Sequence, residues 1–233
     1  MPTIYLLPST MSDTAPQKVL PAGNIEIARR LKFFIVENLR TARRFLKACD
    51  RDIDIDGLTF FELNRHTSPE EVAGMLNPAA EGHDIGIISE AGCPAIADPG
   101  ADVVAIAQRK GYDVCPLVGP SSIILSLMAS GFNGQSFAFL GYLPIDASQR
   151  SAAMHAMERR IKSESQTQIF IETPYRNNKL IAELSRTLPG QMMLCVASDI
   201  TGSKEKIITR PLSWWAKANY NYDKTPTIFL LYR

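Results

Sequence analysis

The sequence has few residues that could bind a metal ion or form disulfide bonds. Its 233 residues include only four cysteines and three histidines. The cysteines are scattered without a Cys-x-x-Cys pair, and the histidines lack the spacing of metal ligands. We therefore expect reduced thiols, no bound metal and no disulfide framework, as is usual for a cytoplasmic protein.

The chain also lacks a strong net charge and a long apolar run. With a formal net charge of +1, any contact with RNA must depend on a local basic patch. The pairs Arg29-Arg30 and Arg43-Arg44 are interpreted as solvated helix faces rather than RNA contacts. No apolar run approaches the roughly 20 residues that span a bilayer, so no membrane association is expected.

Two Gly- and Pro-containing loops lack the glycine spacing of a dinucleotide fingerprint and the Gly-Lys-Ser/Thr of a P-loop. The first, SEAGCPAIADPG at residues 89–100, follows the apolar run 85–88, and a helix is predicted after Pro99-Gly100. The second, VGPSS at residues 118–122, follows a predicted strand at 112–117. Open α/β sheets bind ligands where strands end in such loops, and two adjacent loops would form a crevice with free backbone amides.

The order of the predicted elements indicates an α/β protein with two domains, at residues 1–117 and 118–233. Apolar residues make up 45% of the chain, enough for a substantial core. The first domain is predicted to have a parallel sheet, with strands at residues 3–7, 33–36, 58–63, 85–88 and 112–117 and helices at 24–31, 38–48 and after Ser68. The second is predicted to have a mixed sheet, with strands at residues 136–140, 168–172, 192–197, 206–209 and 227–232 and helices at 149–162 and 174–187.

Taken together, the two loops resemble those of the tetrapyrrole methylase superfamily, the class III S-adenosylmethionine (SAM) methyltransferases. The sequence is most similar to the bacterial small-subunit ribosomal RNA cytidine 2′-O-methyltransferases, whose loops read SDAGxPxxSDPG and PGPSA. Further similar segments follow in the same order: FAFLGYLP at 137–144, FIETPYR at 170–176 and ASDIT at 197–201. The resemblance covers nearly the whole chain.

This resemblance implies a tetrapyrrole methylase-like fold, a homodimer, and SAM bound in a cleft between the two α/β domains. Small residues would allow the backbone to approach the cofactor closely. The residues that match the cofactor-binding positions of the family are Gly92, Cys93, Pro94, Ile96, Ala97, Ser121, Ser122, Ile123, Ala197 and Thr227.

Catalytic candidates lie at the ends of the predicted strands. Glu37 and Arg40 match the Glu-Asp-Thr-Arg of the family, although this chain has Glu-Asn-Leu-Arg. Arg40 would bind an RNA phosphate, or it forms a solvated charge pair with Glu37. Asp98 is either a site carboxylate or a helix cap, and Glu90 and Glu172 are further candidate carboxylates.

A substrate groove is expected over the carboxyl ends of the first-domain strands, bordered by residues 8–13, residues 37–40 and Asp98. The first border departs from the ribosomal RNA family. Where that family has Pro-Thr-Pro-Ile-Gly-Asn, this chain has Pro-Ser-Thr-Met-Ser-Asp, without a glycine.

Three functions are consistent with the sequence. The first is SAM-dependent methylation of a ribose 2′-oxygen, with ribosomal RNA or the small ribosomal subunit as partner. The second is methylation of a small molecule such as a tetrapyrrole, and the third is a SAM-binding dimer without catalytic activity.

Overall fold

A computed structural model describes residues 1–64 and 66–233 of the chain. The chain divides into two compact units, Met1–Ser121 and Ser122–Arg233. Each unit combines a five-stranded sheet with helices. The α/β fold with a parallel sheet and a second, mixed sheet, which the sequence predicts, is therefore confirmed. The division falls after Ser121, whereas the sequence places the domain boundary after residue 117.

The first unit is built on a parallel sheet with the strand order β3-β2-β4-β1-β5. All its neighbouring strands pair in parallel. The strands are β1 (Thr3–Leu7), β2 (Phe33–Val36), β3 (Thr59–Glu62), β4 (Ile85–Ile88) and β5 (Asp113–Pro116). Because the strands are parallel, the segments that follow them all leave from the same edge of the sheet.

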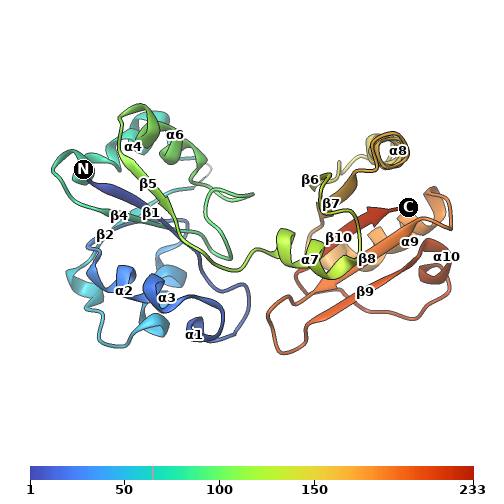
Figure 1. Ribbon diagram of the computed structural model, residues 1–233, viewed down its shortest axis with the longest axis horizontal. Coiled ribbons are helices and arrows are strands. Elements are labelled where there is room, and N and C mark those ends of the chain that lie inside the picture. The colour runs from blue at the N-terminus through green and yellow to red at the C-terminus, as the bar shows by residue number, and fades with distance from the viewer. Residues whose placement is uncertain (65) are drawn as a thin grey trace. The chain divides into compact units, whose positions relative to one another are not determined.

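Helices cover both faces of this sheet (Figure 1). On one face, α2 (Ala22–Arg30) and α3 (Leu39–Cys49) pack through a core that includes Ala28, Phe34 and Leu46. On the other face, α4 (Pro69–Gly74) and α6 (Ala101–Arg109) share a core with Ile35 and Ile85. This two-sided burial explains why β4 is an uninterrupted apolar run.

Short helices of this unit are absent from the sequence prediction. They are α1 (Pro16–Val19), α5 (Asn77–Ala80) and the 3₁₀ turn η1 (Ile55–Gly57). Segments of three or four residues are too short to show a helical period. By contrast, the expected Ser68 cap is present, because its side chain and that of Glu71 form a capping box at α4.

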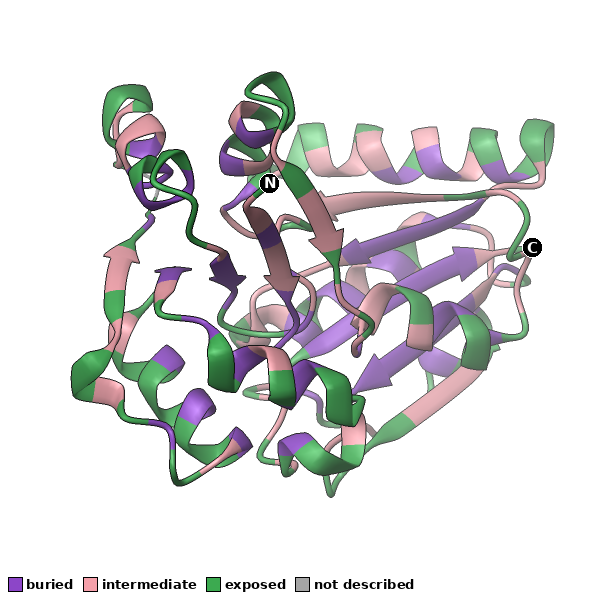
Figure 2. Ribbon diagram, turned by 60° about the vertical axis from the view of Figure 1, so that its left-hand side comes forward, coloured by how far each residue is buried: buried purple, intermediate pink, exposed green. Residues whose placement is uncertain are grey.

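The second unit is built on a mixed sheet with the order β6-β7-β10-β8-β9. Only β6 and β7 pair in parallel, and the other pairs are antiparallel. The strands are β6 (Phe137–Tyr142), β7 (Thr167–Ile171), β8 (Met193–Ser198), β9 (Lys206–Pro211) and β10 (Thr227–Tyr232). The three central strands are largely buried, whereas the edge strands are only half-buried (Figure 2).

Strand β6 runs past the end that the sequence predicts. The predicted strand ends at residue 140, but Gly141 and Tyr142 also belong to β6. The register of the β6–β7 pair shifts between Phe139 and Tyr142, and Gly141 has a φ of +67°. A bulge with a left-handed glycine therefore lets the strand continue through a residue that sequence patterns associate with turns.

Helices also cover both faces of the second sheet. One face packs against α8 (Ala147–Glu164), α9 (Asn177–Thr187) and α10 (Leu212–Trp215). The other face contacts α7 (Ser122–Ser130), which lies against β9 and β10. The predicted helix from residue 174 begins instead with a 3₁₀ turn, η2 (Pro174–Arg176), and the α-helix starts at Asn177.

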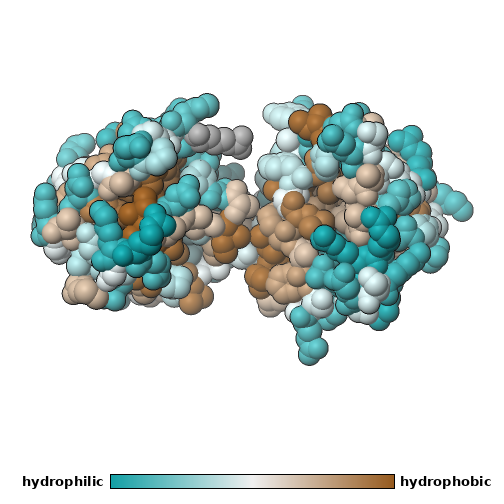
Figure 3. All heavy atoms as spheres, turned by 90° about the horizontal axis from the view of Figure 1, so that it is seen from above, coloured by the Kyte–Doolittle hydropathy of each residue, from teal (hydrophilic) through white to brown (hydrophobic). Residues whose placement is uncertain are grey.

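Hydrophilic residues cover much of the surface of each unit in the view of Figure 3, with hydrophobic patches between them. Among the exposed apolar side chains are Ile124 and Met128 of α7. The part of the chain that the structure describes contains no helix long and apolar enough to cross a membrane.

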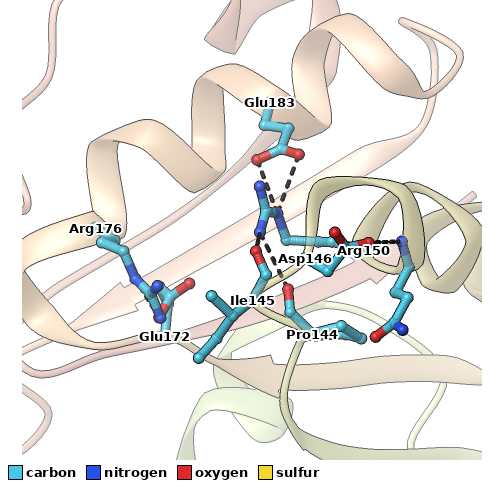
Figure 4. A network of polar contacts seen from close by, with 8 residues as sticks. Pro144, Ile145, Asp146, Arg150, Glu172, Arg176 and Glu183 are labelled. Atoms are coloured by element: carbon cyan, nitrogen blue, oxygen red, sulfur yellow. Dashed lines mark hydrogen bonds and ion pairs between the residues drawn. The ribbon is translucent and has the colours of Figure 1, made fainter.

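An ion-paired network joins two helices of the second unit (Figure 4). Arg150 of α8 donates from Nε to both carboxylate oxygens of Glu183 on α9, at 3.0 Å each. Its Nη1 donates to the carbonyl oxygens of Pro144 and Ile145, at 3.1 and 2.6 Å. Because the side chains of Arg150 and Glu183 are only 12% and 18% exposed, this guanidinium holds the β6–α8 turn against α9.

We predict that Arg150→Ala lowers the free energy of unfolding by about 2–4 kcal/mol, because a mostly buried carboxylate and two carbonyl oxygens lose the hydrogen bonds that Arg150 donates to them. Urea denaturation measures the loss. Lys162→Ala is the matched control on the same helix, since it removes an ion pair with Glu158 in which the lysine is 64% exposed. That control should cost less than about 1 kcal/mol. Equal losses in both variants would contradict the stabilising role of Arg150.

Candidate functional site

Three loops at the carboxyl edge of the first sheet pack directly against one another. The backbone N–H of Ser9, after β1, donates to the carbonyl of Gly92, after β4, at 2.9 Å. The Ser9 hydroxyl donates to the carbonyl of Ser89 at 3.1 Å. The Cys93 thiol donates to the carbonyl of Pro120, after β5, at 3.5 Å. The two loops singled out in the sequence therefore lie side by side.

Glycines make this close packing possible at two points. A Cβ placed on Gly119 would come within 2.3 Å of the Pro8 side chain, which is closer than any side chain could approach. A Cβ on Gly92 would lie 3.3 Å from the Pro120 carbonyl oxygen, and Gly92 has a φ of +76°. Gly119 therefore leaves no room for a side chain, whereas Gly92 is favoured by its left-handed backbone and by a tight contact with Pro120.

The loop at residues 89–100 has an unusual backbone. Besides two glycines, Ala95 and Ala97 have positive φ values of 66° and 63°. Left-handed alanines are uncommon and are found where the surroundings hold the strain, as at ligand sites. Among the described residues, no protein acceptor takes the backbone N–H of Ile96 or Ala97. These exposed amides can therefore bind an anionic group such as a carboxylate.

The other cofactor-binding candidates lie at the boundary between the two units of the chain or inside the second unit. Ser121 ends the first unit, and Ser122 and Ile123 begin α7. Ala197 lies in β8 and pairs with Ile228, and it is fully buried. Because side chains alternate along a strand, Ala197 lies on the face of the sheet that carries α7, opposite the core that contains Val196.

The Thr227 hydroxyl is already engaged within the protein. It accepts a hydrogen bond from the Asn177 amide at 3.1 Å and donates to the Thr225 carbonyl at 2.9 Å. Asn177 begins α9, so the Thr227 side chain lies on the helix-covered face opposite Ala197. The structure therefore does not bring the side chains of Thr227 and Ala197 to one face.

Three carboxylates gather where β2 and β4 end. Glu37 follows β2, and Glu90 and Asp98 belong to the loop after β4. The backbone N–H of Glu90 donates to Oε2 of Glu37 at 3.4 Å, and Thr41 donates to Oε1 of Glu90 at 3.1 Å. The cluster forms because β2 and β4 are neighbours in a parallel sheet.

Burial, together with the negative charges of Glu37 and Glu90, raises the pKa of Asp98 to about 6. The interpretation of Asp98 as a helix cap is wrong. Helix α6 starts at Ala101 and its cap is Gly100, whose φ of 126° turns the chain into the helix. Asp98 therefore remains a half-buried carboxyl group that does not cap the helix.

Arg40 is exposed on the first turn of α3. The charge pair considered for Glu37 and Arg40 is not among the ion pairs found within residues 1–64 and 66–233. Glu172, another candidate carboxylate, forms an ion pair with Arg176 at 2.6 Å. It lies in the second unit, in the region drawn in Figure 4.

A hollow of about 690 Å³ opens beside the acidic cluster. Its walls are the segment 9–16 after β1, the exposed flank of α3, and residues 88–91 at the end of β4. We call it the α3 hollow. Of the three borders that the sequence predicts for a substrate groove, only Ser9 to Asp13 line this hollow, because residues 37–40 and Asp98 are not among its lining residues. Its charged α3 side chains are Arg44 and Lys47. The helical spacing of Thr41, Arg44 and Ala48 is the signal that could have shown this flank.

Cys93 has a packing role rather than the character of a reactive thiol. Burial raises its pKa, which keeps the thiol protonated and able to donate to Pro120. Elsewhere, no group of three or more His, Cys, Asp or Glu side chains suited to a metal ion occurs in the described parts of the chain.

No family model matches the chain, but curated proteins and solved structures do. It is 26% identical over 234 residues to the ribosomal RNA small subunit methyltransferase I of Vibrio cholerae, covering 99% of this chain and 77% of that protein. It is 30% identical over 175 residues to the protein of the same name from Pasteurella multocida, covering 74% and 61% of the two chains. The chain spans between 49% and 77% of the length of such relatives.

Two solved structures share the fold along almost the entire chain. The methyltransferase CobJ has a TM-score of 0.64 at 14% identity, over 99% of this chain and 93% of that one. Uroporphyrin III C-methyl transferase from Thermus thermophilus has a TM-score of 0.59 at 15% identity, over 99% and 97%. The chain has the fold of the tetrapyrrole methylase superfamily. The resemblance to that superfamily, which the sequence indicates, is therefore confirmed.

We predict that Asp98→Asn stabilises the protein at pH 8 and has little effect near pH 4. The folded-state pKa of Asp98 is raised from 3.8 to about 6, so folding disfavours the ionised form. This penalty appears as the pH rises above 4 and is complete above 6. Urea denaturation at pH 8 should show a gain on the order of 1–2 kcal/mol, after allowance for solvent around a half-buried group. The control Asp102→Asn, exposed in the first turn of α6, should show no such gain.

Proposed function

We propose that the protein transfers a methyl group from SAM to a ribose 2′-oxygen of small-subunit ribosomal RNA. The observation that carries this proposal is the packing of the 89–100 and 118–122 loops around Gly92, within a fold shared with methyltransferases. The names of the curated relatives support ribosomal RNA as the acceptor.

The residues of the first unit suit the methionine end of SAM. The exposed amides of Ile96 and Ala97 can bind its carboxylate, and the small residues Gly92, Cys93 and Pro94 leave room for a ligand beside the backbone. Ser121, Ser122 and Ile123 of the second loop would complete the site. Ala197 and the backbone of Thr227 would contact the adenosine.

When bound, SAM supplies an electrophilic methyl group on a positively charged sulfur. The protein must hold the acceptor hydroxyl in line with that methyl group and take up the hydroxyl proton as the new O–C bond replaces the S–C bond, which leaves S-adenosylhomocysteine as the second product. Asp98 is the proposed base, since a carboxyl with a pKa of about 6 is ionised at neutral pH yet accepts a proton more readily than an ordinary aspartate. Glu37 would keep that pKa high, and Arg40 would contact a neighbouring phosphate.

One observation favours a different acceptor. Of the two structural neighbours, one is named uroporphyrin III C-methyl transferase, after a tetrapyrrole, and the other is named only as the methyltransferase CobJ. The second candidate function is therefore methylation of a small molecule on carbon, with the same cofactor site.

The acceptor is tested by offering the purified protein and labelled SAM either small-subunit ribosomal RNA or a tetrapyrrole. We expect label only on the RNA, in a nucleotide that resists alkaline cleavage because its 2′-oxygen is methylated. The Asp98→Asn variant should lose most of this activity, with a reduction of about 10²–10⁴-fold. Label on the tetrapyrrole alone would establish the second candidate function instead.

We predict that Gly92→Ala weakens SAM binding at least about tenfold, because the new methyl group meets Pro120 and displaces the loop. Isothermal titration calorimetry measures the affinity. Gly111→Ala is the matched control: Gly111 also has a positive φ, of 74°, but nothing lies within 4 Å of the added Cβ. Both variants should lose a similar free energy of unfolding, about 1–2 kcal/mol, because each places an alanine in the left-handed conformation. Unchanged SAM affinity in Gly92→Ala, or no SAM binding by the native protein, would rule out this site.

We further propose that the protein acts in the cytoplasm as a twofold-symmetric homodimer, which is the commonest symmetric assembly of soluble proteins. Light scattering at micromolar concentration should give twice the mass of the chain. A monomer under these conditions would contradict the dimer.

A further inference from the structure

The α3 hollow is lined by two chemically different sets of residues. The loops after β1 and β4 contribute the polar residues Thr10, Ser12 and Thr14 and the acidic residues Asp13 and Glu90. Helix α3 contributes the basic residues Arg44 and Lys47. A ligand that fills this hollow must therefore present anionic groups to the basic set and neutral hydrogen-bonding groups to the other.

Arg44 is available to such a ligand. Its side chain is exposed, and it takes part in none of the hydrogen bonds, ion pairs or ring contacts found among the described residues. Lys47 also lines the hollow, and its Nζ donates to the carbonyl of Arg51 at 2.8 Å. An arginine without a partner on a concave wall can bind phosphate oxygens with two parallel hydrogen bonds.

We propose that the α3 hollow holds the RNA strand next to the reacting nucleotide, with a backbone phosphate on Arg44 and Lys47 and ribose hydroxyls towards Glu90 and Asp13. This inference rests on the proposed function, because it assumes that the acceptor is RNA. It adds the position of the strand and two phosphate contacts. Arg40 lies one helical turn before Arg44, so an RNA strand that runs along α3 would pass from Arg40 to Arg44.

An RNA strand fits this wall chemistry better than a tetrapyrrole does. Along RNA, a single negative charge alternates with a neutral sugar that has a free hydroxyl, and carboxylates accept hydrogen bonds from such hydroxyls. A tetrapyrrole has carboxylates around its rim, and some of them would meet Asp13 and Glu90 across the hollow. Repulsion between these like charges would disfavour binding of a tetrapyrrole.

The same helix offers a matched control. Arg43 is adjacent to Arg44 and equally charged, but it lies on the other flank of α3, where its guanidinium is 5.4 Å from the centre of the Phe60 ring. It does not line the hollow. Replacing Arg43 or Arg44 by alanine therefore changes the net charge equally, and only the second change alters the wall of the hollow.

The test measures binding of a single-stranded fragment of small-subunit ribosomal RNA by the native protein, Arg44→Ala, Arg44→Glu and Arg43→Ala over a range of salt concentrations. Arg44→Ala should weaken binding about tenfold at 0.1 M salt and reduce the slope of log K against log salt by about 0.7, the loss of one phosphate contact. Arg44→Glu should weaken binding further, and Arg43→Ala should match the native protein. All variants should keep the native melting temperature and SAM affinity.

Equal effects of Arg43→Ala and Arg44→Ala would overturn the inference, because only the net charge would then matter. If the native protein methylates the RNA and neither Arg44 variant changes binding or the salt slope, the inference fails while the proposed function stands. If the Arg44 variants lose RNA binding as expected but no methyl group reaches RNA, the hollow holds RNA and the proposed reaction is wrong. An absence of RNA binding by the native protein would overturn both.

Discussion

The candidate site depends on how closely three loops approach one another at the carboxyl edge of the first sheet. Pro8 lies against Gly119 at a separation that leaves no room for a side chain, and Gly92 lies in tight contact with Pro120. The Ser9–Gly92 hydrogen bond joins the loops after β1 and β4 at the same place. This packing can hold Ala95 and Ala97 in left-handed conformations that would be unfavourable in an isolated chain.

The acidic cluster follows from the same arrangement. Because β2 and β4 are parallel neighbours, Glu37 and Glu90 emerge side by side, and the loop returns Asp98 to the same region. Three carboxylates near one another oppose folding at neutral pH, since their charges repel and Asp98 is partly removed from water. Proteins keep such unfavourable groups where they serve a reaction, at some cost to stability. The cluster is therefore more informative about function than the ion pairs of the second unit, which stabilise the fold.

The second unit shows how strand alternation divides residues that look equivalent in the sequence. Val196 faces the core beneath α8, α9 and α10, whereas Ala197 faces α7. Thr227 is paired with Ser198 on the neighbouring strand, yet its hydroxyl is bound to Asn177 and Thr225. A role for Thr227 in cofactor binding must therefore come from its backbone.

The sequence by itself determined the class of fold, the parallel first sheet, the mixed second sheet and the two loops. It could do so because the apolar run at 85–88, the glycines and the cap at Ser68 act locally, through burial and backbone conformation. The continuation of β6 past Gly141 and the starts of α1 and α5 were not predictable, since a bulge and a helix of four residues depend on neighbouring strands and loops. Only the tertiary structure decided that Asp98 joins Glu37 and Glu90, that the Thr227 side chain turns away from Ala197, and that Arg44 rather than Arg43 lines the α3 hollow. Each of these depends on which strand lies beside which and on how each helix is rotated against the sheet, and both are set by the packing of the whole domain.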